Sequence, residues 1–167
     1  MTPSPHIVLN QPEPPSEPVP VSEEDIQKIL GERTAREHVQ FRSVEVVFMS
    51  PEEIIEINKK YLNHDYVTDI ITFRLDEPSG DGEKSGIRHG NQDGKALVNE
   101  SIEGTLCCCD DQIRKQSKEL KTGEREEFLR VVIHGMLHLC GWEDETAEQR
   151  AAMRARENVY LGLMDTV

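Results

Sequence analysis

The sequence predicts a single domain of the α+β or α/β class, with one layer of β-sheet and helices packed against it. Its 167 residues suffice for one domain whose core buries most of the apolar surface of the chain. A few short segments have the composition of strands, and segments with helical spacing of apolar residues lie between them. No internal repeat is visible. A few strands placed among helices indicate one small sheet.

The first 21 residues are the most proline-rich part of the chain. They hold seven of the nine prolines, which favours an extended and poorly ordered lead. Residues 6–9, with the sequence His-Ile-Val-Leu, are the only strand candidate within this lead. We therefore expect the folded domain to begin at residue 22.

Three helix starts have a recognisable capping pattern. In each, a serine or threonine is followed three residues later by an acidic residue or glutamine, and both side chains can bond backbone N–H groups of the first turn. The pairs are Ser22 with Asp25, Ser50 with Glu53, and Thr146 with Gln149. Helices are therefore expected to begin directly after residues 22, 50 and 146.

The remaining elements are expected between these helices. Strands are predicted at residues 44–48, at residues 69–73 and around Cys107, and two further helices at about 111–120 and 123–140.

The connection between the last two strands is unusually long. Residues 75–101 are polar and rich in glycine, so they form either a functional lid or a disordered segment, and we expect a flexible insertion. The sequence thus predicts a single domain at residues 22–162, followed by a short tail at residues 163–167.

The net charge of −13 has the wrong sign for a protein that binds RNA mainly by neutralising phosphates. Basic residues nevertheless gather around Lys59, Lys60, His64 and Arg74, where a local basic cleft is one interpretation and a solvated surface the other. If RNA is the substrate, we expect low affinity or a partner that brings the protein to it.

The four cysteines do not suggest a disulfide framework. Cys107, Cys108 and Cys109 are adjacent, which opposes a simple bridge between them, and Cys140 falls in a predicted helix. Buried strand residues explain the run better than a metal site does, because no Cys-x-x-Cys spacing is present. No window is long enough for a membrane span, and no signal peptide is visible. We expect a cytoplasmic protein with no membrane partner.

His134 and His138 are the clearest candidates for metal ligands. They lie four residues apart in the helix expected at 123–140, so both imidazoles project from one face. Glycine enters the left-handed conformation readily, so Gly141 can end this helix and let the chain bring Asp144 back over the same face. Three protein ligands leave one position of the ion open, as catalytic zinc sites do.

The register of this helix supports a metal site. A histidine pair at this spacing is by itself more often a surface or capping feature. Here the apolar residues occupy one broad arc, and the two imidazoles lie on the other side with Glu127. The apolar arc consists of Phe128, Leu129, Val132, Ile133, Met136, Leu137 and Cys140.

Two imidazoles and a carboxylate suit Zn²⁺ best, although the same set can form the facial triad of an Fe²⁺ site. We expect one Zn²⁺ ion. The carboxylate of Asp144 cancels one unit of the ion's charge, so a water on the ion should be less acidic than beside a third imidazole. Activity should then need a higher pH.

One position separates this helix from that of a metalloprotease. In the His-Glu-x-x-His pattern, the glutamate beside the first histidine is the general base. Gly135 stands there in this chain and has no side chain to accept a proton. The spacing of His134, His138, Gly141 and Asp144 otherwise matches the metzincin layout, but peptide hydrolysis by that mechanism is disfavoured.

The motifs resemble those of the YbeY family of zinc-dependent single-strand endoribonucleases. The metal stretch is similar to the family signature His-Gly-x-Leu-His-Leu-x-Gly-(Tyr/Trp)-Asp-His. Residues 58–73 are similar to the pattern Asn-x-x-Tyr-x-x-x-Asp-x-x-Thr-Asp-Val-Leu-Ser-Phe, and residues 102–109 resemble a strand usually written Gly-Asp-Ile-x-Ile-Ser. The resemblance covers roughly residues 38–160.

The chain departs from these patterns at four positions. Asp144 stands at the third histidine, Glu143 at the preceding Asp, Leu62 at an Arg that is functionally important in many members, and Thr105 at the Asp after Gly104. A carboxylate also binds zinc, so the resemblance implies a variant family member with Asp144 as third ligand.

The resemblance implies an α+β fold: a single small mixed β-sheet with helices packed on it and the metal-binding helix lining a cleft. It also implies an enzyme, a zinc-dependent endoribonuclease that cuts single-stranded RNA in ribosomal RNA maturation and ribosome quality control. The implied partners are ribosomal RNA and the small ribosomal subunit or a ribosomal protein.

The roles of the other polar residues stay open. His134 and His138 are the predicted catalytic residues through the ion they hold. His64, Asp65 and the pair Thr68 and Asp69 are candidates for substrate contact or for orienting a ligand histidine, and turn formation before a strand is the alternative. Glu143 is a candidate base or a solvated acid.

Two other functions remain open at this point. One is a metzincin-like metallohydrolase of peptides or small molecules. The other is a non-catalytic, ribosome-associated protein with a structural zinc.

Overall fold

The structure is a computed structural model that describes residues 5–14, 17–75 and 101–165, with the side chains of residues 33–35 excepted. Its elements are β1 (His6–Asn10), α1 (Glu23–Glu37), β2 (Gln40–Met49), α2 (Pro51–Ile57), the π-helix η1 (Asn58–Leu62), β3 (Ile70–Arg74), β4 (Ser101–Cys109), α3 (Asp110–Leu120), α4 (Glu124–Leu139) and α5 (Ala147–Leu161).

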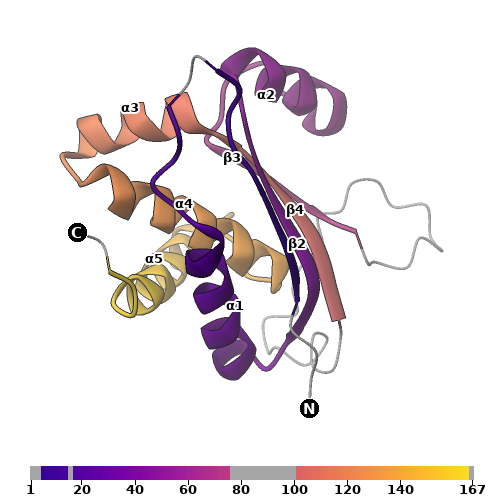
Figure 1. Cartoon of the computed structure of the whole chain (residues 1–167), viewed down its shortest axis with the longest axis vertical. Coiled ribbons are helices and arrows are strands. Elements are labelled where there is room, and N and C mark those ends of the chain that lie inside the picture. Colours follow the sequence, from indigo (N-terminus) through magenta and orange to yellow (C-terminus); the bar gives the residue numbers. More distant parts are fainter. Residues whose placement is uncertain (1–4, 15–16, 76–100, 166–167) are drawn as a thin grey trace.

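The described strands form one mixed sheet in the order β1-β2-β4-β3. β1, β2 and β4 are parallel, whereas β3 pairs with β4 in the antiparallel direction. Helices α1, α4 and α5 lie on one side of this sheet and α2 on the other (Figure 1). The predicted α+β fold with a single small mixed sheet is therefore confirmed.

The core divides between the two faces of the sheet because side chains alternate along a strand. Leu106 and Cys108 of β4 pack in the larger cluster with α1, α4 and α5. Cys107 and Cys109 point the other way, into a smaller cluster with Ile54 of α2. All four cysteines are buried and none is in a disulfide, which agrees with the interpretation of the run as strand residues.

The three predicted helix starts are confirmed with their capping boxes. Ser22, Ser50 and Thr146 each accept a hydrogen bond from the backbone N–H three residues later, and the side chain at that later position binds back to the cap. These bonds satisfy N–H groups that the first turn of a helix otherwise leaves free.

The described part of the N-terminal lead contributes a strand and buried side chains to the fold. β1 covers the one strand candidate and pairs with β2, with Ile7 opposite Val44. Val19 and Val21 are buried in the core. The apolar side chains outweigh the prolines here because the prolines flank the strand instead of interrupting it.

The predicted insertion at residues 75–101 lies almost wholly outside the described residues. Only its ends are described: Leu75 donates its N–H to the carbonyl of Glu103 at 2.8 Å, and Ser101 begins β4. At the other end of the chain, Met164 of the predicted tail packs against the core. Among the described residues, no helix is both long enough and apolar enough to cross a membrane.

Two glycines let α4 approach the sheet closely. A Cβ on Gly135 would lie 2.5 Å from Cδ1 of Ile70 and 3.0 Å from Cδ2 of Leu106. A Cβ on Gly104 of β4 would lie 2.6 Å from Cδ2 of Leu139. The two sites fix the depth at which α4, and the histidines it carries, sit on the sheet.

Candidate metal centre

The end of α4 brings a carboxylate back over the helix face that carries two histidines. His134 and His138 are one turn apart on α4. Gly141 has φ of 100°, a conformation that favours glycine, and Trp142 donates its N–H to the carbonyl of Leu137 at 3.0 Å. This reversal returns the chain toward the helix before α5 begins.

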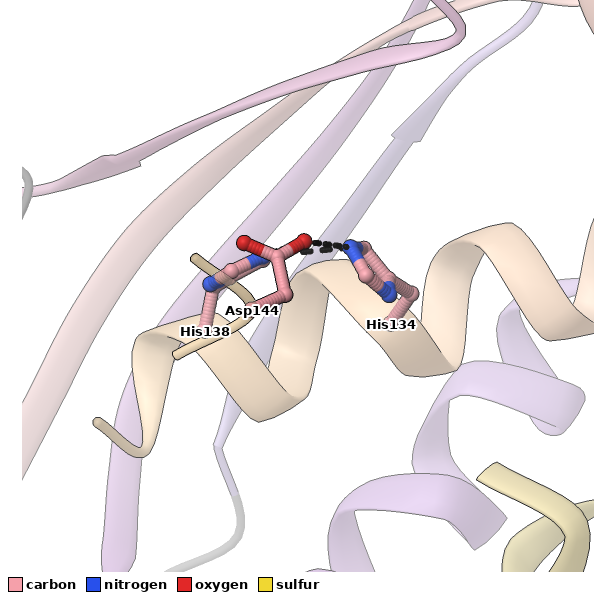
Figure 2. A group of neighbouring side chains, drawn as sticks. All are labelled: His134, His138 and Asp144. Atoms are coloured by element: carbon pink, nitrogen blue, oxygen red, sulfur yellow. Dashed lines mark hydrogen bonds and ion pairs between the residues drawn. The ribbon is translucent and has the colours of Figure 1, made fainter. Parts of the chain in front are cut away.

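The three predicted ligands lie together. The Nε2 atoms of His134 and His138 are 3.1 Å apart, and Oδ2 of Asp144 lies 3.3 Å from each of them (Figure 2). Their side chains are between a quarter and two fifths exposed, so an ion could reach them. Among the described residues, this is the group of acids, histidines and cysteines that could hold a metal ion.

The donor atoms fit a single ion. Zinc binds nitrogen and carboxylate oxygen at about 2.0–2.2 Å, so donors around one tetrahedral ion are separated by about 3.3–3.6 Å. The observed separations of 3.1, 3.3 and 3.3 Å are close to these values. The site can therefore hold a divalent cation without rearrangement of its backbone.

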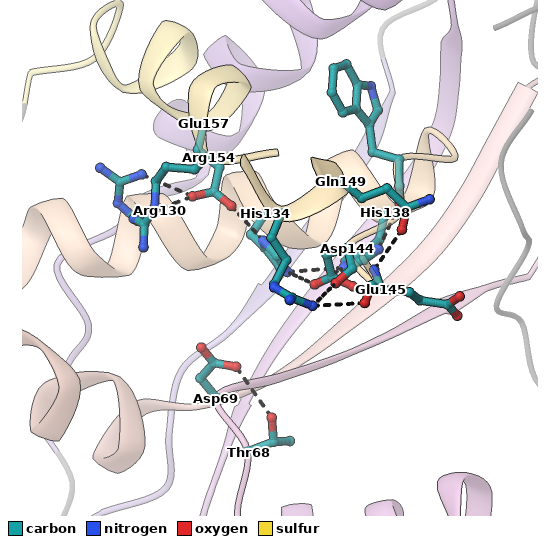
Figure 3. Close-up of polar contacts among 12 residues, drawn as sticks. Thr68, Asp69, Arg130, His134, His138, Asp144, Glu145, Gln149, Arg154 and Glu157 are labelled. Atoms are coloured by element: carbon teal, nitrogen blue, oxygen red, sulfur yellow. Dashed lines mark hydrogen bonds and ion pairs between the residues drawn. The ribbon is translucent and has the colours of Figure 1, made fainter. Parts of the chain in front are cut away.

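Each imidazole is held by its other nitrogen. Nδ1 of His134 lies 2.6 Å from Oε2 of Glu157 (Figure 3). Nδ1 of His138 lies 2.9 Å from the carbonyl oxygen of Trp142. A carboxylate and a carbonyl accept hydrogen bonds, so both Nδ1 atoms carry a proton. Each Nε2 therefore points toward Asp144, and once it has given up any proton it carries, its lone pair is available to an ion.

Glu157 is itself fixed by arginines. It is 4 % exposed, and its Oε1 accepts a hydrogen bond from Nη1 of Arg130 at 3.0 Å. Arg154 lies at 3.8 Å from the same oxygen. The support of His134 thus extends from α5 back to α4.

The charges of the group are strongly coupled. Burial opposes the charged form of His134, but hydrogen bonds with Asp144 and Glu157 outweigh it and raise the pKa to about 9. Hydrogen bonds from His134 and His138 hold the pKa of the Asp144 carboxyl far below its usual value. Without an ion, a proton on His134 therefore balances the carboxylates, and a cation can replace that proton.

Two cavities adjoin the group and share Asp69, His134 and Asp144. The strand-side cavity, about 370 Å³, is lined by residues of β3 and the end of α4, including Leu62, Ile70, Arg74, Leu139 and Trp142. The helix-side cavity, about 330 Å³, lies between α3, α4 and α5 and is lined by charged residues, including Glu127, Arg130, Arg150, Arg154 and Glu157. The expected cleft beside α4 is therefore present.

The structure brings only two of the four other candidate residues to these cavities. Thr68 lines the strand-side cavity and Asp69 lines both. His64 and Asp65 line neither: His64 stacks on Tyr66, and Asp65 lies 3.7 Å from Lys59 at the surface.

Asp69 is held in place from a second helix. Nε2 of Gln116 donates to Oδ2 of Asp69 and to Oε2 of Glu127, each at 3.2 Å. Burial raises the pKa of Glu127, which lines the helix-side cavity. Glu143, a candidate base, lines the strand-side cavity and accepts a hydrogen bond from Gln149 at 3.1 Å.

The sequence prediction missed Glu157. A usable signal existed, because Glu157 shares a helix face with Met153 and Tyr160, and an acidic residue on an apolar face needs a partner. The identity of that partner, His134, depends on how α5 crosses α4, which the sequence does not specify.

The family model described as Endoribonuclease YbeY matches residues 16–165. The chain belongs to the YbeY family. Its membership confirms the family resemblance and the prediction of an enzyme of the metal-dependent hydrolase class.

Individual YbeY proteins are similar over most of their length. The Endoribonuclease YbeY of Chlorobaculum parvum is 35% identical over 138 residues, which cover 83% of this chain and 80% of the relative. That of Parabacteroides distasonis is 36% identical over 121 residues, or 72% of this chain and 70% of the relative.

A solved structure is similar in fold. The solution structure of TM1509 from Thermotoga maritima matches with a TM-score of 0.53 and 23% identity, covering 93% of this chain and 86% of the other.

Proposed function

We propose that this chain is a Zn²⁺-dependent endoribonuclease that cuts single-stranded RNA in ribosomal RNA maturation and ribosome quality control. The observation that carries the proposal is the triangle of donor atoms from His134, His138 and Asp144, in a chain of the YbeY family. In this proposal the three residues hold one ion, and the two histidines are catalytic through it.

Zinc is proposed over iron because two imidazoles and one carboxylate, with a further position left open, are typical of catalytic zinc sites. The separations of the donor atoms are compatible with such a site.

The protein residues prepare the site for hydrolysis of a phosphodiester. When bound, Zn²⁺ supplies the Lewis acidity that activates water and stabilises negative charge on phosphoryl oxygens. Glu157 and the carbonyl of Trp142 keep the two imidazoles in one tautomer and orientation. Asp69 and Thr68, at the wall of the strand-side cavity, are proposed to contact the substrate.

The strand-side cavity supports single-stranded RNA as the substrate. Leu62, Ile70, Leu139 and Trp142 give it apolar walls next to the polar donors. An unpaired nucleotide can place its base against such walls, whereas a base within a duplex stays stacked.

The acidic surface supports a role on the ribosome. A net charge of −13 disfavours tight binding to free RNA. We therefore propose that the small ribosomal subunit or one of its proteins brings the enzyme to ribosomal RNA. We also propose a cytoplasmic location, and its support is chemical: the four cysteines are buried and form no disulfide.

Gly135 opposes peptide hydrolysis of the metzincin type. A Cβ at this position would already collide with Ile70. No glutamate can therefore occupy the place of the protease base, and no other observation favours a peptide substrate.

The test is a cleavage assay on the purified, zinc-loaded protein. Single-stranded RNA, the same RNA annealed to its complement, and casein are offered to the wild type, to His138→Ala and to His6→Ala. His6 is exposed on β1, outside both cavities, so its variant controls for loss of a histidine.

We expect the wild type and H6A to cut single-stranded RNA, with bound zinc near one equivalent. H138A should lose bound zinc and at least a hundredfold in rate. Cleavage that persists in H138A would refute the assignment of the site. Zinc binding without any RNA cleavage would instead support a structural, non-catalytic ion.

A further inference from the structure

We infer that Arg150 and Arg154 of α5 form a phosphate-binding subsite beside the metal centre, for the phosphate of the nucleotide that adjoins the cleavage site. The inference rests on the proposed function and adds to it the path that the RNA strand takes, from the strand-side cavity to the helix-side cavity. It is carried by the position of the two guanidinium groups and by what they bind.

Arg150 and Arg154 lie beside the metal centre. Residues 150 and 154 are one turn apart on α5, and both line the helix-side cavity together with His134 and Asp144. Nη1 of Arg150 donates to the carbonyl oxygen of Glu145 at 2.9 Å and to that of Asp144 at 3.4 Å. The guanidinium of Arg150 is therefore one hydrogen bond from the backbone of a proposed zinc ligand.

Both arginines can offer N–H donors to a phosphate. An arginine has five N–H donors, and the hydrogen bonds of Arg150 in the described part of the chain use those of Nη1. Nε and Nη2 stay available. Arg154 is 58% exposed, and its ion pair in the same region is with Glu157 at 3.8 Å. At 3.8 Å and with the arginine largely in solvent, this ion pair contributes little, so a phosphate can displace it at low cost.

The other arginines near the metal centre are less available. Nη1 of Arg130 binds Glu157 at 3.0 Å, and its Nη2 binds Asn158 at 2.9 Å. Arg74, in the strand-side cavity, is 4 % exposed and donates to the carbonyl of Leu139 at 3.3 Å. Accessible positive charge next to the metal centre thus lies on the helix side.

The two cavities then have different chemistry. The strand-side cavity has apolar walls. The helix-side cavity has the planar guanidinium groups of Arg150 and Arg154, whose N–H donors match the oxygens of a phosphate. Because both cavities share Asp69, His134 and Asp144, a strand that places a nucleoside in the first leads its next phosphate into the second. In a chain with net charge −13, such a local site supplies the attraction that the whole surface lacks.

The test uses zinc-loaded full chains and a short single-stranded RNA of defined cleavage site. Arg150→Gln, Arg154→Gln and the double variant are compared with Arg42→Gln, a charge-matched control. Arg42 is 66% exposed, pairs with Glu103 across the sheet, and lines neither cavity. The readouts are kcat/KM as a function of salt, bound zinc, and the effect of one neutral methylphosphonate linkage moved along the RNA.

The double variant should keep its zinc and lose about tenfold to hundredfold in kcat/KM at moderate salt. The slope of log kcat/KM against log salt should fall by about 0.7 for each phosphate contact removed. In the wild type, one linkage next to the cleavage site should be sensitive to the neutral replacement. That sensitivity should vanish in the double variant, while R42Q behaves as the wild type.

Two outcomes would overturn the subsite: a salt slope in the double variant equal to that of R42Q, or a methylphosphonate effect of the same size in both proteins. Failure of the proposed function is distinct. If the wild type binds zinc and cuts no RNA, equilibrium binding of the same oligonucleotides to the same variants decides on the subsite by itself.

Discussion

Nδ1 of His134 lies 2.6 Å from Oε2 of Glu157, and this contact joins α4 to α5 at the metal centre. Glu157 is 4 % exposed and is held from its other oxygen by Arg130. A buried carboxylate that accepts a hydrogen bond from Nδ1 of a metal-binding histidine fixes the ring. It also makes Nε2 donate its electron pair to the ion more strongly. The affinity of the centre for its ion therefore depends on a residue of α5.

Replacement of Glu157 should weaken zinc binding without removing a ligand. We expect Glu157→Ala to lower the affinity about 10- to 100-fold, and Glu157→Gln, whose amide oxygen can still accept from Nδ1, to lower it less. Competition with a chelator of known affinity measures the effect. Glu148→Gln, on the exposed side of α5, is the control. An E157A affinity equal to that of E148Q would show that the contact does not support the ion.

Zinc binding should become tighter as the pH rises. In the metal-free protein the pKa of His134 is raised to about 9, so the ring is protonated at neutral pH and must lose a proton when it binds the ion. One released proton makes the apparent affinity rise about tenfold per pH unit, up to about pH 9. Chelator competition at pH 6.5, 7.5 and 8.5 measures the slope, and E157Q should flatten it because it removes one group that raises the pKa of His134. A pH-independent affinity in the wild type would contradict this account.

Asp144 stands where the family signature has a histidine, so Asp144→His tests what the carboxylate does. The imidazole should retain the ion and leave it with one more unit of positive charge. The acid limb of the kcat/KM profile should therefore shift to lower pH. Rates measured between pH 5.5 and 9 give the comparison, with bound zinc measured in parallel, and a profile that does not move would indicate that the third ligand has no influence on the reacting groups.

The local parts of the fold were predictable because each depends on a short stretch of sequence. The capping boxes at Ser22, Ser50 and Thr146 involve residues three apart. The grouping of His134, His138 and Asp144 follows from helix periodicity and from one glycine. In each case the interacting residues lie within about ten positions of one another.

What could not be predicted depends on contacts between distant segments. The pairing of β1 with β2, 37 positions away for Ile7 and Val44, decided the order of a proline-rich segment. The contact between His134 and Glu157 depends on the crossing of two helices, and that of Asp69 with Gln116 spans 47 positions. Sequence patterns indicate that Glu157 and Asp69 need partners, but not which ones.

The stability of the protein should depend on the charge of Asp25. Arg125 binds this carboxylate with two hydrogen bonds, at 2.8 and 2.9 Å. The hydrogen bond from Arg125 is the largest influence and, despite burial, the pKa of Asp25 lies below its ordinary value of 3.8. Folding therefore favours the ionised form: the stabilisation is complete above about pH 4 and is lost as the pH falls through the lowered pKa of the folded state.

We expect Asp25→Asn to lower the free energy of unfolding by about 1–3 kcal/mol at pH 7. The difference from the wild type should shrink below pH 4. Urea denaturation at pH 7 and pH 3 measures it, and Glu24→Gln, an exposed change in the same helical turn, controls for a lost acid near a helix start. A difference that is the same at both pH values would show that the charge of Asp25 is not responsible.

The same substitution at two helical glycines should have opposite effects. Gly31 of α1 has nothing within 4 Å of an added Cβ, so Gly31→Ala should stabilise the protein by up to about 1 kcal/mol through the lower entropy of the unfolded chain. At Gly135 the added Cβ would lie 2.5 Å from Ile70, so Gly135→Ala should destabilise by about 1–3 kcal/mol and lift α4 from the sheet. Because α4 carries both histidines, zinc affinity should fall in G135A and stay unchanged in G31A. Ile70→Val removes the Cδ1 atom in the way, so the double variant G135A/I70V should recover part of both losses, and a double variant no better than G135A would show that the close approach of α4 to β3 is not what makes glycine necessary.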